Sequence, residues 1–195
     1  MKKRYAALIF CAIGLLLGSV TSEAKKKPSV TAESAIVMDV QSGAILYEKN
    51  IDKREYPASI TKVMTALVAI ENSSLSETVT YSRNAVTNLE SGASNIEIQP
   101  GEKLSMEDSL YAILLMSANE ACNGVAEHVA GNIDNFVAMM NEKAKELGCQ
   151  NTHFANPHGL HDENHYTCCY DMALIARAAY QNETFRIIVG TARYT

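Results

Sequence analysis

Hydrophobic residues recur every three or four positions along several stretches of this chain, and the first clear stretch begins near residue 59. Its apolar positions are Ile60, Val63, Met64, Leu67 and Val68. This spacing places them in one stripe of a helix that buries a single face. We therefore predict an amphipathic helix over residues 59–71, with Ser59 at its start.

Four further helices follow from the same periodicity and from residues that favour helix ends. Ser105 and Asp108 have the spacing of a capping pair, and the residues that follow are strongly apolar. Gly131 and Gly148 stand where glycine commonly ends a helix. The predicted ranges are 105–116, 119–130, 133–147 and 171–180.

Short runs rich in β-branched residues precede these helices. Residues 35–40 and 44–47 flank the turn-forming Gln41-Ser42-Gly43, a pattern typical of a β-hairpin. Residues 73–100 are polar and are predicted to be mostly loop, with weak strand candidates at 78–81 and 95–98. A long loop is expected between the last two helices.

The first residues carry the pattern of an export signal. Three basic residues precede an apolar run over 5–17, and small residues lead to Ala24. The run is shorter than the ~20 residues that span a bilayer. We predict a signal peptide over residues 1–24, a disordered lead-in over 25–32, one domain over 33–195, and export to the periplasm, cell wall or medium.

Composition excludes some classes of protein. The chain has 195 residues, of which 47% are hydrophobic, and a formal net charge of -5. This charge does not favour binding to nucleic acid. Four cysteines lie beyond the predicted signal, and the sequence leaves open whether they are buried thiols or include one disulfide; these are Cys122, Cys149, Cys168 and Cys169.

Ser59 and Lys62 form the first candidate catalytic pair. At positions i and i+3 of a helix both side chains lie on one face, so the amine can reach the hydroxyl. A lysine beside a buried stripe loses its proton more readily and can act as a base. Taken alone, the pair also fits a helix-capping serine beside a solvated lysine.

A second polar cluster interrupts two predicted helices. Ser117 and Asn119 follow a very apolar helix and precede the next one. Polar side chains at such a buried edge need partners, which a cleft would provide. The simpler interpretation is an N-cap of the second helix.

The loop over 150–167 holds four histidines, which raise a metal site as an alternative. Their spacing matches no standard zinc pattern, so we favour an ordered loop that lines the cleft; the histidines are His153, His158, His161 and His165.

Together these segments resemble the D-alanyl-D-alanine carboxypeptidases, the low-molecular-mass penicillin-binding proteins. The resemblance rests on Pro57-Ala58-Ser59-Ile60-Thr61-Lys62, on Ser117-Ala118-Asn119 within its apolar context, and on Asn156-Pro157-His158-Gly159-Leu160. It implies an α/β (α+β) fold of the β-lactamase/transpeptidase type, with a helical lobe and an antiparallel sheet.

The resemblance also implies roles for individual residues. Ser59 would be the acylated nucleophile, Lys62 the base, Ser117 a proton relay and Asn119 a substrate-binding residue. The substrate would be a peptidoglycan stem peptide ending in D-Ala-D-Ala, and β-lactam antibiotics would be inhibitors. No metal or organic cofactor is implied.

One family motif has no match in this sequence. The Lys-Thr-Gly or His-Thr-Gly tripeptide is absent, and residues 184–195 hold nothing similar. We therefore expect an amino-terminal fragment that lacks strands of the sheet and half of the oxyanion hole. A separate C-terminal polypeptide would then be a partner.

Two other functions stay open at this point. A class A β-lactamase would have Ser-Asp-Asn in place of Ser117-Ala118-Asn119, and a later Glu-x-x-x-Asn segment that we do not find. An inactive remnant that only binds wall peptide or penicillin is the other alternative.

Overall fold

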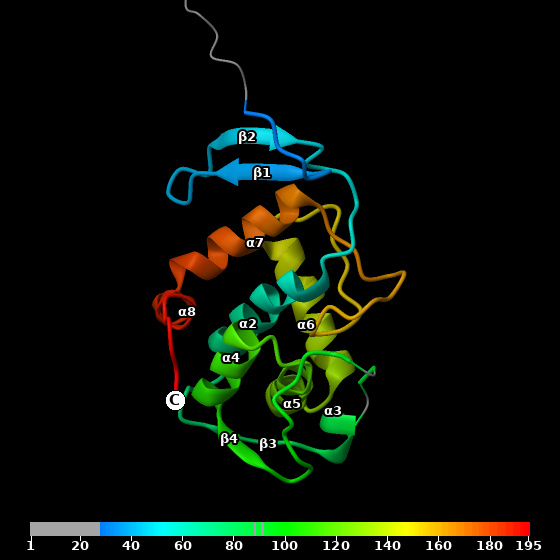
Figure 1. Cartoon of the computed structure of the whole chain (residues 1–195), viewed down its shortest axis with the longest axis vertical. Coiled ribbons are helices and arrows are strands. Elements are labelled where there is room, and N and C mark those ends of the chain that lie inside the picture. Colours follow the sequence, from blue (N-terminus) through cyan, green and yellow to red (C-terminus); the bar gives the residue numbers. More distant parts are fainter. Residues whose placement is uncertain (1–27, 88, 91) are drawn as a thin grey trace, which may run out of the picture. The chain divides into compact units, whose positions relative to one another are not determined.

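A computed structural model describes residues 28–87, 89–90 and 92–195 (Figure 1). The predicted signal peptide over 1–24 and residues 25–27 of the predicted lead-in over 25–32 lie outside the described residues. Residues 32–195 form one unit by their internal contacts.

Helices and two short antiparallel sheets alternate along this unit. In chain order they are β1 (Ala35–Met38), β2 (Ile45–Lys49), the 3₁₀ turn η1 (Ala58–Ile60), α2 (Thr61–Asn72), β3 (Thr78–Thr80), α3 (Arg83–Thr87), β4 (Lys103–Ser105), α4 (Met106–Leu115), α5 (Asn119–Ala130), α6 (Ile133–Glu146), α7 (Cys169–Gln181) and α8 (Glu183–Val189).

Helix α2 lies at the centre of the helical part (Figure 1), where it contacts α4, α5, α6, α7 and α8. Its buried residues belong to two core clusters on opposite sides. Leu67 belongs to a core cluster with α4, α5 and α8, whereas Met64 and Val68 belong to a second cluster with α6 and α7. The prediction of a single buried stripe was therefore wrong. Ile60 was predicted to be buried in this stripe, but it is 53% exposed.

The helix ends match the sequence signals. The Ser105 hydroxyl accepts a hydrogen bond from the Asp108 N–H and caps α4. Gly131 and Gly148 follow α5 and α6 with positive φ angles, as expected for glycine at these ends. The four predicted helices are confirmed with small changes in their bounds.

The region between α2 and α4 differs from the prediction. It contains α3 as well as β3, and β3 pairs with β4, a strand that the sequence analysis missed. Residues 95–98 form no strand, because the Ile96 N–H donates to the Glu120 carboxylate at 2.6 Å and not to a neighbouring strand. Helix α8 was also missed.

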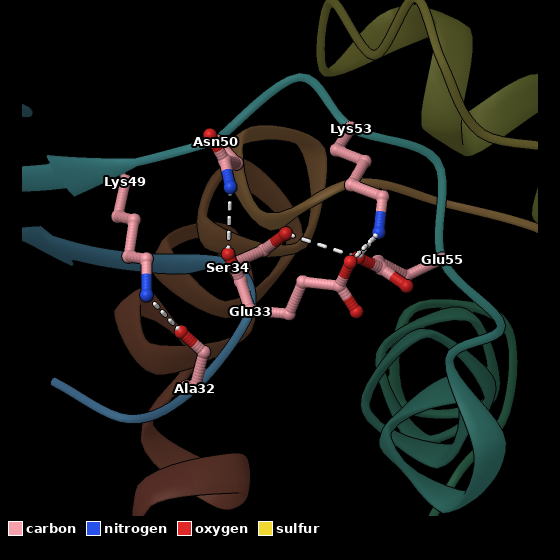
Figure 2. A network of polar contacts seen from close by, with 7 residues as sticks. All are labelled: Ala32, Glu33, Ser34, Lys49, Asn50, Lys53 and Glu55. Carbon is pink, nitrogen blue, oxygen red and sulfur yellow. Dashed lines mark hydrogen bonds and ion pairs between the residues drawn. The ribbon is translucent and has the colours of Figure 1, made fainter.

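The predicted hairpin is confirmed as β1 and β2, and a polar network ties its base to the next segment (Figure 2). Lys53 contacts both Glu33 and Glu55, and Glu55 accepts a hydrogen bond from Ser34 at 3.0 Å. The Glu55 backbone in turn pairs with Thr167. These contacts hold the segment that leads into η1.

The four described cysteines, Cys122, Cys149, Cys168 and Cys169, are free thiols. Cys168 precedes α7, and its sulfur accepts the Asp171 N–H at 3.5 Å. The thiols thus act as buried or half-buried packing and capping groups in this structure.

Candidate active site

Ser59 and Lys62 are brought together one turn apart, as the sequence predicted. Ser59 lies in the η1 turn and the α-helix itself begins at Thr61, so the predicted α-helical start at Ser59 is corrected by two residues. The Lys62 Nζ lies 3.3 Å from the Ser59 Oγ. The tight turn keeps the Ser59 side chain exposed while Lys62 is drawn into the protein.

The Lys62 side chain is 3% exposed, and three oxygen atoms surround its amine. Nζ donates to the Asn119 Oδ1 at 2.8 Å and to the His158 carbonyl at 2.7 Å, in addition to its contact with Ser59. A neutral amine has only two N–H bonds. When both point at Asn119 and His158, the lone pair is directed at the Ser59 hydroxyl, which is the arrangement a general base needs.

The surroundings of Lys62 shift its amine toward the neutral form. Burial lowers the pKa of Lys62, while the nearby Cys122 and Glu120 act in the opposite direction. Burial has the larger effect because removing an ammonium ion from water is costly. The same surroundings lower the pKa of His158 to about 4, first through burial and then through the positive charge that Lys62 carries when it is protonated.

Ser117 and Asn119 approach the pair from the junction of α4 and α5. The Ser117 hydroxyl donates to the Ser59 Oγ at 3.0 Å, and its backbone has a φ of 56°. A non-glycine residue in the left-handed region is strained, and such residues gather at functional sites. Asn119 opens α5 and is 3% exposed.

The loop after α6 closes the site from the other side. Besides the His158 carbonyl, the Pro157 carbonyl accepts the Thr65 hydroxyl at 2.5 Å. The Thr61 hydroxyl lies 2.8 Å from the His165 Nε2. Sequence reasoning missed both threonines, although polar residues within a buried helix are a signal that could have identified them.

Gly159 is a further residue whose role was not assigned. Its φ is 90°, and a Cβ at this position would lie 1.9 Å from the Ala58 carbonyl oxygen. Ala58 itself has a φ of 50°. Only glycine allows the loop to approach the residue before Ser59 so closely.

The histidines of this loop point to separate partners. His165 is buried against Thr61, His153 contacts the Asn164 carbonyl at 2.6 Å, and His161 packs against the Tyr56 ring. Within residues 28–87, 89–90 and 92–195, no group of three metal-binding side chains gathers.

A serine and a buried lysine one turn apart, with a second serine hydroxyl hydrogen-bonded to the first, form an arrangement typical of active-serine hydrolases. The chain belongs to the D-alanyl-D-alanine carboxypeptidase family, whose sequence model matches residues 21–194.

Individual relatives and solved structures agree with this family. The carboxypeptidase DacF of Bacillus subtilis is 36% identical over 97% of this chain, and the D-alanyl-D-alanine carboxypeptidase of Streptomyces sp. is 32% identical over all of it. The crystal structure of penicillin binding protein 6B from Escherichia coli matches 89% of this chain and 57% of its own, with a TM-score of 0.83 and 29% identity. The predicted fold class is confirmed.

The matches cover different shares of the relatives. The chain spans 51% of the length of DacF and 72% of the Streptomyces protein.

Proposed function

We propose that this chain provides the acylating half of a serine-type D-alanyl-D-alanine carboxypeptidase, which removes the terminal D-Ala from peptidoglycan stem peptides. The observation that carries the proposal is the environment of Lys62. Two acceptors, on Asn119 and His158, occupy the N–H bonds of the neutral amine and leave its lone pair for Ser59.

The reaction would proceed through an ester on Ser59. The hydroxyl proton passes to the Lys62 Nζ as the Oγ attacks the carbonyl carbon of the D-Ala-D-Ala bond. The proton then reaches the leaving amine of the terminal D-Ala through the Ser117 hydroxyl, which lies 3.0 Å from the Ser59 Oγ. Water later attacks the ester and restores the serine. Asn119 would orient the substrate through its amide.

A β-lactam would form the same ester, because its strained amide carbonyl is attacked by the same oxygen. The test is to incubate the protein with a penicillin, alone and as a fusion with the C-terminal half of DacF, and to locate the adduct by peptide mass spectrometry. We expect one adduct, on Ser59, that is lost in Ser59→Ala and kept in Ser82→Ala. An adduct on another residue would refute the assignment.

We also propose a polypeptide partner for the β1–β2 hairpin. An apolar cavity of about 850 Å³ lies between the hairpin, α2 and α7, lined by Ile36, Met38, Leu46, Ile60, Met172 and Tyr180 among others. A strand added along the hairpin edge would pair its backbone groups and cover this surface. Such strands would also provide the second oxyanion donor and the carboxylate site that the family resemblance implies.

A complementation assay tests this partner. We expect little release of D-Ala from a D-Ala-D-Ala peptide by the chain alone, since the proposed partner strands would supply one oxyanion donor, and loss of such a donor costs ~10² to 10³ in rate. Adding the C-terminal half of DacF as a separate polypeptide should restore turnover. Full turnover without it would contradict the proposal.

Export is the proposed location, through cleavage after Ala24. Among the residues that the structure describes, no helix is long and apolar enough to span a membrane. Expression in a bacterium with an intact export pathway, followed by sequencing of the mature N-terminus, would check the cleavage site. A mature protein that begins at Met1 would contradict it.

A further inference from the structure

Glu120 is a buried acidic residue that the mechanism above does not use. It follows Asn119 in the first turn of α5, and its side chain is 2% exposed. A carboxylate so far from water needs compensation from its surroundings. Its contacts therefore show how the first turn of α5 is held in place.

One carboxylate oxygen holds a segment that precedes β4. The Glu120 Oε1 accepts the Ile96 N–H at 2.6 Å, and the Ser94 carbonyl accepts the Asn119 N–H at 2.9 Å. Residues 94–96 are thus attached to the first turn of α5 at two points. The second of these points is the backbone of Asn119, whose side chain contacts Lys62.

The Glu120 Oε2 is buried and has no hydrogen-bond partner among the residues that the structure describes. Its negative charge raises the pKa of Lys62, against the larger effect of burial. Cys122, from the same helix, acts in the same direction as Glu120, and His158 faces Lys62 from the loop.

We propose that Glu120 is a positioning residue for the Lys62–Asn119 pair: its carboxylate fixes residues 94–96 to α5, and its charge acts on the Lys62 amine. The inference deepens the proposed function, since it rests on Lys62 as the base. The carboxylate has a geometric role through its hydrogen bond to Ile96 and an electrostatic role through its charge, so substitutions can separate the two.

The experiment titrates the Lys62 amine by NMR in protein with isotope-labelled lysine, with Lys62→Arg to assign the signal. Glu120→Gln keeps an oxygen for the Ile96 N–H but removes the charge, so we expect the Lys62 titration to move to lower pH. Glu120→Ala removes both, and the Ile96 amide should also exchange with solvent about tenfold faster, as for loss of one hydrogen bond to a charged group.

Asn123→Ala is the matched control. Asn123 is also buried on α5, at 2% exposure, but its amide donates to the Ala85 carbonyl on α3. We expect this variant to leave the Lys62 titration and the Ile96 exchange unchanged.

Two results would overturn the proposal: a Glu120→Gln titration equal to that of the parent, or a shift of the same size in Asn123→Ala. An unchanged Ile96 exchange rate in Glu120→Ala would overturn its geometric half. None of these measurements requires turnover. A chain in which Ser59 is never acylated would therefore refute the proposed function without affecting this titration.

Discussion

The two sides of α2 differ in how completely this chain covers them. Toward α4, α5 and α6 the helix packs into closed core clusters, and Leu67 is 1% exposed. Toward the hairpin lies the 850 Å³ cavity, where Leu46 is 69% exposed. Lys62 and its two acceptors, on Asn119 and His158, all belong to the covered side. Because the two sides are covered to different degrees, acylation of Ser59 and the proposed addition of a strand to the hairpin can be tested by separate experiments.

The largest expected effect is on the covered side, at Gly159. A methyl group there would overlap the Ala58 carbonyl and would also require an unfavourable positive φ. We expect Gly159→Ala to destabilise the fold by at least about 3 kcal/mol and to abolish acylation of Ser59. Chemical denaturation and penicillin labelling measure the two effects.

Gly148→Ala is the control for this substitution. Gly148 has a φ of 85°, but nothing lies within 4 Å of its added Cβ. It should lose only about 1 to 2 kcal/mol, the cost of the backbone conformation. Equal losses in both variants would show that the close approach to Ala58 does not matter.

The next effect is catalytic. Lys62→Arg keeps the positive charge but cannot provide a neutral amine at working pH. We expect the rate of acylation by a penicillin to fall by at least ~10²-fold in the DacF fusion, as for loss of a general base. Lys143→Arg, which changes a surface ion pair with Glu71, is the control. An arginine variant that acylates at the parent rate would exclude the base role.

Low pH should reduce the stability of the fold, because two histidines on the covered side of α2 have lowered pKa values. Burial lowers the pKa of both His158 and His165 from 6.5 to about 4. The folded state therefore binds fewer protons than the unfolded chain between these values. Their contribution to stability is present above pH 6.5 and is lost as the pH falls toward 4.

Thermal melts at several pH values measure this loss. We expect Tm to fall between pH 6.5 and 4, and to fall less steeply in His165→Gln. His161→Gln, on the exposed part of the same loop, should keep the parent slope. If Tm falls with pH as steeply in His165→Gln as in the parent, His165 does not contribute to the loss of stability in acid.

The smallest effect is expected on the hairpin side. Leu46→Ala should change the free energy of unfolding of the chain by no more than about 0.5 kcal/mol, because the side chain is already exposed. Leu67→Ala, the matched substitution in the core, should cost about 2 to 5 kcal/mol. The Leu46 variant should nevertheless weaken complementation by the C-terminal half of DacF. Unchanged complementation would argue against strand addition at this cavity.

Local signals in the sequence predicted much of the fold. The helices α4 to α7 and the hairpin followed from hydrophobic spacing, and three helix ends followed from Ser105, Gly131 and Gly148. These features depend on interactions between residues a few positions apart. The proximity of Ser59 and Lys62 was predictable for the same reason.

Contacts between distant segments were decided only by the tertiary structure. The sequence cannot show that the His158 carbonyl meets the Lys62 amine across 96 positions, or that α2 is buried on opposite sides. It also offered a weak strand candidate at 95–98, where the Glu120 carboxylate holds the backbone instead. Hydrophobic periodicity reports which face of an element is apolar, but the partner of each buried polar group depends on how the elements pack.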